Sequence, residues 1–171
     1  ALALSARSDR YHVKSIKPLP RRKLYEKVPL MDCFTAPCMG GCPIRQDIPE
    51  YIELCRKGQY ASALRLITEK NPLPFITGTI CAHNCMTKCT RNFYEEPVNI
   101  RATKLVAAEK GYDTYMSKLR PPVPAGTNTR VAVVGGGPTG MAAAYFIGRA
   151  GIPVTLYEKT DRLGGIVRHV I

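Results

Sequence analysis

The spacing of apolar residues predicts a series of short helices in the middle of the chain. Between Asp47 and Gly58, apolar residues recur at the i, i+3, i+4, i+7 positions that share one helix face. These residues are Ile48, Tyr51, Ile52 and Cys55. Asp47 suits the N-cap, Pro49 suits the first turn, and Gly58 suits the end of the helix. We therefore expect a helix here with one buried face.

Two further helices follow from the same periodicity. One has an apolar stripe that stops before Asn71-Pro72, formed by Tyr60, Ala63, Leu64 and Ile67. Another is expected from about Ile100 to Met116, with Leu105, Ala108, Tyr112 and Tyr115 facing inward. Helices of this length are marginal in water by themselves. Something else must hold them together, and the cysteines are the candidates.

The pattern changes after residue 129 to strand, glycine loop, helix and strand. A β-branched run, Arg130 to Val134, precedes Gly135-Gly-Gly-Pro-Thr-Gly140, and a second strand is expected from Val154 to Glu158. Residues 118–129 are rich in proline and cannot continue a helix. We therefore divide the chain into a basic lead-in (1–31), a helical domain (32–117), a linker (118–129) and the start of a nucleotide-binding domain (130–171).

Six of the seven cysteines form two triplets within the helical domain. Their spacings are Cys33-x4-Cys38-x3-Cys42-Pro43 and Cys81-x3-Cys85-x3-Cys89. An x3 gap places two cysteines at i and i+4 on one helix face. Thiolates are the preferred ligands of iron–sulfur clusters, and in bacterial ferredoxins the cysteine before a proline ligates the other cluster. The triplets therefore predict iron–sulfur ligation, with Cys42 crossing between clusters.

Other interpretations of the cysteines remain open. Zinc sites favour two-residue gaps and often include histidine, whereas this chain has no such gap and only His83 nearby. Disulfides or unligated thiols are a further alternative. Cys55 lies on an apolar helix stripe, so we interpret it as a small buried hydrophobe.

The glycine loop lies where a dinucleotide phosphate would bind. Its G-x-G-x-x-G pattern stands between a strand and a helix, and Glu158 follows the last glycine by 18 residues. Gly135 permits the tight turn, Gly137 the approach of a pyrophosphate, and Gly140 close helix–strand packing. The helix N-terminus attracts the phosphate, and Glu158 favours the ribose of FAD or NAD. An ordinary glycine turn in an α/β unit is the alternative.

The net charge of +12 raises the possibility of nucleic-acid binding. Half of this charge lies in residues 1–31, and no basic motif with interleaved aromatic residues accompanies it. We therefore expect a solvated linker or a face for an acidic redox partner, and no nucleic acid as partner. No apolar run is long enough to span a membrane. Clustered cysteines point to a reducing, cytoplasmic setting.

The stretch from Asp32 to Ile171 resembles a known protein family. The motifs that carry the resemblance are Asp32-Cys-Phe-Thr-Ala-Pro-Cys38, Gly41-Cys-Pro43, Asn71-Pro-Leu-Pro-Phe75, Thr79-Ile-Cys81, Pro97-Val-Asn-Ile100, Gly135 to Gly140, and Asp161-Arg-Leu-Gly-Gly165. They are similar to the glutamate synthase small subunit and the N-terminal half of dihydropyrimidine dehydrogenase. They are most similar to the iron–sulfur flavoprotein subunits named for selenate reduction.

The resemblance implies a mostly α fold: an α-helical ferredoxin domain with one or two [4Fe–4S] clusters, then the first β-α-β unit of an incomplete Rossmann-like FAD-binding domain. It implies one cluster on Cys33, Cys38 and Cys89, and another on Cys42, Cys81 and Cys85. The family has a further cysteine where this chain has Leu30, and a Gln or Glu ligand near Lys104. The FAD-binding residues it implies, with those of the loop, are Gly135, Gly137, Pro138, Thr139, Gly140, Glu158, Arg162, Gly164 and Gly165.

The expected function is that of an electron-transfer fragment of an iron–sulfur flavoprotein oxidoreductase. Electrons would pass between NAD(P)H, FAD and the site of a partner subunit or domain through [4Fe–4S] clusters. The sheet is expected to be truncated at Ile171, so that the fragment by itself would hold FAD weakly, carry no catalytic residue and be inactive alone. The alternatives are a docking or assembly module whose clusters are structural or absent, and a zinc-bound nucleic-acid module.

Overall fold

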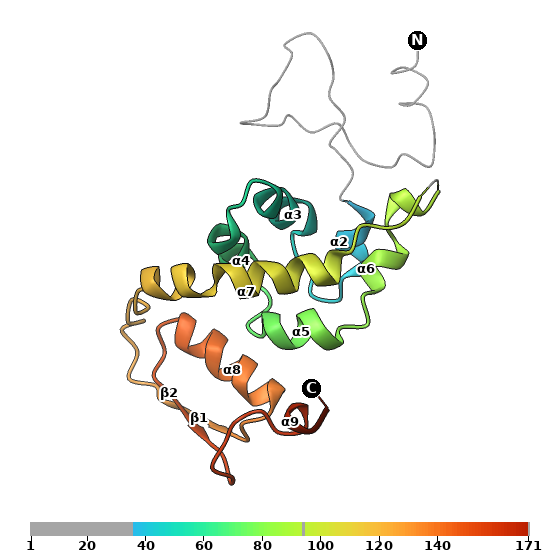
Figure 1. The fold of residues 1–171 in the computed structure, drawn as a ribbon. Coiled ribbons are helices and arrows are strands. Elements are labelled where there is room, and N and C mark those ends of the chain that lie inside the picture. Colours follow the sequence, from blue (N-terminus) through green and yellow to red (C-terminus); the bar gives the residue numbers. More distant parts are fainter. Residues whose placement is uncertain (1–35, 94, 171) are drawn as a thin grey trace, which may run out of the picture. The chain divides into compact units, whose positions relative to one another are not determined.

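A computed structural model describes residues 36–93 and 95–170 of the chain (Figure 1). Helices occupy the described part up to Lys118, and a parallel pair of strands with its connecting helix begins at Val131. The predicted fold class, mostly helical with a β-α-β unit, is confirmed. The basic lead-in, Leu30 and Cys33 lie outside the described residues.

The helical part begins with short helices and ends with a long one. The elements are α2 (Pro37–Gly41), α3 (Ile48–Arg56), α4 (Tyr60–Thr68), α5 (Pro74–Ile80), α6 (Asn84–Thr87), the 3-10 helix η1 (Thr90–Phe93) and α7 (Ile100–Lys118). The long helix α7 packs against α4, α5 and α3. Figure 1 shows α7 running across these shorter helices. No described helix has the length and apolar character needed to cross a membrane.

The predicted apolar faces of α3 and α4 are confirmed. Ile48 and Tyr51 of α3, and Ala63, Leu64 and Ile67 of α4, are each at most 2% exposed. Asp47 occupies the N-cap of α3, although its side chain accepts no capping hydrogen bond. Gly58 adopts a left-handed φ of 72°, a conformation in which glycine avoids the steric penalty of a side chain.

The inward face predicted for α7 is partly wrong. Tyr112 is 44% exposed and packs edge-on against Phe75. The buried positions are instead Ile100, Lys104, Ala107, Ala108 and Gly111. The reason is close helix packing, because a Cβ at Gly111 would lie only 2.5 Å from the carbonyl oxygen of Tyr60 on α4. Small residues permit this approach, whereas aromatic side chains on that face would separate the helices.

The second region is a single β-α-β unit. Strands β1 (Val131–Val134) and β2 (Val154–Tyr157) pair in parallel, and α8 (Pro138–Arg149) connects them; α9 (Val167–Val170) follows. The Tyr145 hydroxyl and the Arg149 guanidinium of α8 both donate to the carbonyl of Thr68, each at 3.1 Å. These bonds satisfy a carbonyl at the end of α4 that a helix leaves unpaired. They fasten α8 to the helical part.

Candidate functional site

The cysteines lie at helix ends. Cys42 is the C-cap of α2 and Cys81 is the C-cap of α5, while Cys89 lies two residues beyond α6. The expectation that x3 pairs share the face of one continuous helix is therefore wrong. Cys81 and Cys85 are separated by His83, whose φ of 45° is left-handed and interrupts the chain between α5 and α6.

The structure nevertheless brings described cysteines of the two triplets together. Cys38 on α2 lies within electrostatic range of Cys89 and Cys42, and Cys85 on α6 lies within range of Cys42 and Cys81. The packing of α2 against α6 accounts for this proximity. Burial raises the pKa of the Cys38 and Cys85 thiols. Metal binding at these thiols would therefore have to displace their protons.

A cavity of about 180 Å³ contains the three cysteines Cys42, Cys81 and Cys85 in its lining. Buried apolar residues form part of its wall, among them Ile48 and Tyr51. Within residues 36–93 and 95–170, no three or more Cys, His, Asp or Glu side chains are arranged so that they could hold a metal ion. The fit to an iron–sulfur cluster therefore rests on the chemistry of the donor set, which consists of soft thiol sulfurs gathered from both triplets.

Backbone and side-chain hydrogen bonds fix the turn that carries Cys81. The N–H of His83 donates to the Cys81 sulfur at 3.4 Å. Arg101 of α7 donates to the Cys81 carbonyl and to Nδ1 of His83, each at 3.2 Å. Donors to a ligand sulfur are among the groups that tune a cluster's reduction potential. The turn thus positions the thiol and places one N–H group, that of His83, against its sulfur.

Lys104 lies in the wall of the same cavity. Lys104 is only 5% exposed. The charged or titratable groups near it are Cys81, Cys42, Cys85 and Arg101. Burial lowers the pKa of its ammonium group, and the three cysteines act in the opposite direction. A lysine is therefore buried beside the described cysteines of the second implied cluster.

The glycine loop has the geometry of a phosphate-binding turn. Gly135 has a φ of 105°, and its N–H donates to the carbonyl of Tyr157 at 2.7 Å. A Cβ at Gly140 would collide with the Gly135 carbonyl oxygen, so only glycine permits this close approach. A Cβ at Gly137 would meet nothing within 4 Å. The loop therefore leaves open space at the N-terminus of α8, where a phosphate would bind.

Two downstream segments pack against this loop. Glu158 accepts from the N–H of Gly136 at 2.6 Å, and this hydrogen bond lowers the pKa of its carboxyl. The N–H of Gly164 donates to the Gly136 carbonyl at 2.8 Å, and Gly165, with a left-handed φ of 53°, faces Gly137. Arg162 is instead largely exposed beside Asp161. Of the residues expected to bind the nucleotide, Arg162 makes no contact with the loop among the described interactions.

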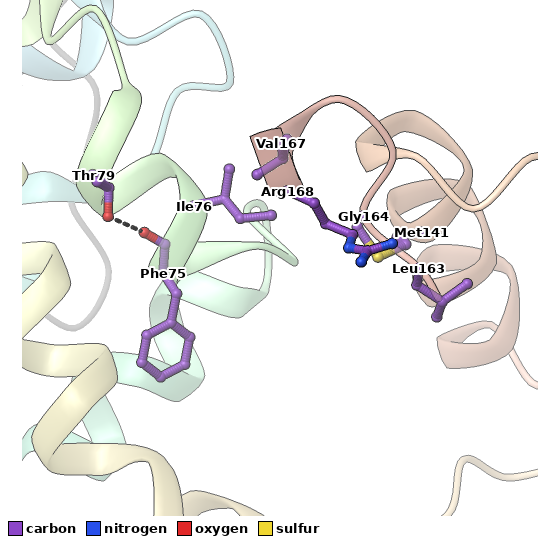
Figure 2. A pocket seen from close by; sticks show the side chains of 8 residues that line it. All are labelled: Phe75, Ile76, Thr79, Met141, Leu163, Gly164, Val167 and Arg168. Atoms are coloured by element: carbon purple, nitrogen blue, oxygen red, sulfur yellow. Dashed lines mark hydrogen bonds between the residues drawn. The ribbon is translucent and has the colours of Figure 1, made fainter. Parts of the chain in front are cut away.

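A second cavity, of about 390 Å³, lies beside the loop (Figure 2). Figure 2 shows side chains of α5 on one side and side chains that follow the loop on the other. Sequence reasoning did not assign a role to any of these residues except Gly164, although two lie in the motifs Asn71–Phe75 and Thr79–Cys81. The lining consists of Phe75, Ile76, Thr79, Met141, Leu163, Gly164, Val167 and Arg168.

Comparison with known proteins defines the class of this chain. Residues 24–115 match the family described as dihydropyrimidine dehydrogenase domain II, 4Fe-4S cluster, and residues 133–170 match the NAD(P)-binding Rossmann-like domain. The first match covers more than half of the chain. The chain therefore belongs to the dihydropyrimidine dehydrogenase domain II family of 4Fe-4S proteins and continues into a Rossmann-like unit.

Its relatives bear the names of oxidoreductases. The chain is 48% identical, over 99% of its length, to the provisionally named oxidoreductase YgfK of Escherichia coli K12. It is 38% identical over 82% of its length to the glutamate synthase [NADPH] small chain of Mycobacterium tuberculosis H37Rv, and 39% identical over 75% to the NADPH-Fe(3+) oxidoreductase subunit beta of Geobacter sulfurreducens PCA. The matches span 16%, 29% and 19% of these relatives. The predicted resemblance to the glutamate synthase small subunit and dihydropyrimidine dehydrogenase family is confirmed.

Proposed function

We propose that the chain is the electron-transfer part of an iron–sulfur flavoprotein oxidoreductase, which passes electrons between NAD(P)H, FAD and a partner site through [4Fe–4S] clusters. The observation that carries the proposal is the position of α5. This helix lines the cavity beside the glycine loop and ends at Cys81, which lines the cysteine cavity. A helix of seven residues is about 10 Å long, so the two cavities lie a short distance apart.

The proposed cluster ligands are the two sets implied by the resemblance. Cys33, Cys38 and Cys89 would hold one cluster, and Cys42, Cys81 and Cys85 the other. The proximity of Cys38 to Cys89, and of Cys85 to Cys42 and Cys81, supports these sets. Such clusters, when bound, supply one-electron transfer.

The proposed nucleotide site uses the loop and its neighbours. The pyrophosphate would bind to the loop glycines and to the N-terminus of α8, which includes Pro138 and Thr139. Gly164 and Gly165 would pack against the loop at Gly136 and Gly137. Glu158 would bind the adenosine ribose. Its carboxylate offers about four lone-pair positions, and three hydrogen bonds to Gly136 and Thr160 are described. FAD, when bound, exchanges hydride with a nicotinamide and single electrons with a metal centre.

The setting and partner belong to the same proposal. Two relatives are named as a small chain and a subunit beta, which supports a redox partner subunit or domain for this chain. The clustering of six cysteines in two triplets supports a reducing, cytoplasmic environment.

A pair of cysteine variants tests the cluster assignment. Protein purified anaerobically should show visible iron–sulfur absorption that is bleached by dithionite. Cys85→Ser should lower iron and sulfide per chain, whereas the matched control Cys55→Ser, in the same region, should leave both unchanged. Equal iron in the two variants, or a colourless parent, would contradict the assignment. Iron that dithionite cannot reduce would favour a module with structural clusters.

A glycine variant tests the nucleotide site independently. Gly137→Ala introduces a methyl group into open space, so the unfolding midpoint should stay at the parent value. The same methyl would occupy the place proposed for the pyrophosphate, so the dissociation constant of FAD in an equilibrium titration should rise. Gly148→Ala on α8, where the nearest atom lies at an ordinary 3.6 Å, is the control. Unchanged FAD affinity in Gly137→Ala would refute the site.

A further inference from the structure

The cavity of Cys42, Cys81 and Cys85 contains a buried lysine, and no carboxylate stands among its described lining residues. Lys104 is 5% exposed, and the described residues that line the cavity include no Asp or Glu. Arg101, which also lines it, adds a second positive charge. A buried ammonium group is costly unless an anion compensates it. The thiols around Lys104 are the described groups that can become anionic here.

We propose that Lys104 is the counter-charge of the cluster held by Cys42, Cys81 and Cys85, and that it stabilises the reduced form of that cluster. This inference rests on the function proposed above, because it assumes that these cysteines hold a cluster. It assigns Lys104 an electrostatic role and not a bond to iron.

The sign of the effect follows from charge. Reduction of a thiolate-ligated cluster adds one electron and therefore one negative charge. The apolar wall of Ile48, Tyr51 and Ile100 disfavours this extra charge, because burial penalises charged states. A protonated lysine in the same wall offsets the penalty, since opposite charges interact more strongly where solvent is scarce. Lys104 should therefore raise the reduction potential of this cluster.

The chemistry of the side chain argues against direct ligation. A lysine ammonium has three N–H donors and no lone pair, so it must lose a proton before it can bind a metal. Arginine remains protonated in proteins and cannot ligate iron in this way. An arginine at position 104 would therefore preserve the charge and abolish any ligand role. This difference separates the two roles experimentally.

The experiment compares Lys104→Gln, Lys104→Arg and the control Lys110→Gln in anaerobically purified protein. Lys110 lies on the same helix α7, over the ring of Tyr60 and exposed to solvent. The readouts are iron and sulfide per chain and a redox titration followed by electron paramagnetic resonance. In Lys104→Gln, the ratio of reduced to oxidised cluster at a fixed potential should fall about tenfold or more, which corresponds to about 59 mV for one electron. Lys104→Arg and Lys110→Gln should stay close to the parent.

The outcomes are distinct. A potential in Lys104→Gln equal to that of the parent would overturn the inference and leave the proposed function standing. Loss of iron in both Lys104→Gln and Lys104→Arg would overturn it in favour of a ligand role. Loss of iron in Lys104→Gln alone would support a charge requirement, because arginine preserves the cluster. A parent without iron and sulfide would overturn both the inference and the proposed function.

Discussion

Gly111→Ala should destabilise the protein, although alanine is the better helix former. Gly111 lies within α7 at the point where this helix packs on α4. Helix propensity alone predicts a gain of about 1 kcal/mol for Gly→Ala. Sterics predict the opposite, because the new Cβ would lie 2.5 Å from the carbonyl oxygen and 2.7 Å from the carbonyl carbon of Tyr60. Backbone atoms of a helix cannot rotate away as a side chain can.

The steric effect should be the larger of the two. Restoring ordinary contact requires α4 to move away by roughly 1 Å, a gap that forfeits a quarter to a half of the dispersion energy of each affected contact. The affected surface includes Ala63, Leu64 and Ile67, which are at most 1% exposed. Overpacking of this kind costs about 1–3 kcal/mol, occasionally more. After the propensity gain of about 1 kcal/mol is subtracted, we expect a net loss of up to about 2 kcal/mol.

Urea denaturation followed by circular dichroism, with the metal content held constant, measures this change. The control is Gly148→Ala on α8, where the nearest atom is Val154 Cγ1 at 3.6 Å and the propensity gain should appear without a steric cost. The midpoint should fall for Gly111→Ala and rise or stay unchanged for Gly148→Ala. A Gly111→Ala midpoint at or above that of the parent would refute the close approach of α7 and α4.

Two further predictions concern the nucleotide loop and the metal. The pKa of Glu158 is lowered below its usual 4.5 by the Gly136 N–H, so this hydrogen bond should be complete above about pH 4.5 and be lost as the pH falls through the lowered value. The Gly136 amide resonance should titrate with a midpoint below 4.5, and Glu158→Gln should abolish that titration; a midpoint at or above 4.5 would contradict the bond. Chelation of iron should remove amide-exchange protection more from residues 36–117 than from residues 130–170, because ligand bonds hold the first segment and strand pairing the second. Equal loss in both segments would show that the cysteines do not hold the helical part together.

Sequence periodicity was sufficient for the helices whose inward residues are large and apolar. The buried apolar residues of α3 and α4 all lie on the predicted stripes, although the stripe residues Ile52, Cys55 and Tyr60 are only half-buried. Strands β1 and β2 were found within one residue of their ends. Periodicity failed on α7, because its inward face consists mostly of Ala, Gly and a lysine. Hydrophobic pattern alone gives such residues little weight, and only the packing of α4 reveals why small side chains are required there.

The sequence was sufficient to predict which residues gather at the cysteine site, but it predicted their positions on the helices only in part. The cysteine spacing identified residues that lie near one another in the structure, as Cys85 lies near Cys42 and Cys81. It also predicted that these cysteines share the face of one helix, whereas they lie at the ends of separate helices. The decisive feature is the left-handed conformation of His83, which no local sequence rule demands of a histidine. The cavity beside the glycine loop could not be predicted at all, because it depends on α5 packing opposite residues about 90 positions later in the chain.

The hydrogen bonds from α8 to Thr68 connect these two halves of the site. Tyr145 and Arg149 donate to the Thr68 carbonyl at the end of α4, although they lie about 80 positions later in the chain. The same bonds hold α8, whose N-terminus carries the glycine loop, against the helical part that contains the cysteines. The residues after the loop also face α5 across one cavity, and α5 is followed directly by Cys81. The arrangement thus joins the glycine loop and the cysteine-bearing helices in one packed unit, through contacts that local sequence patterns do not predict.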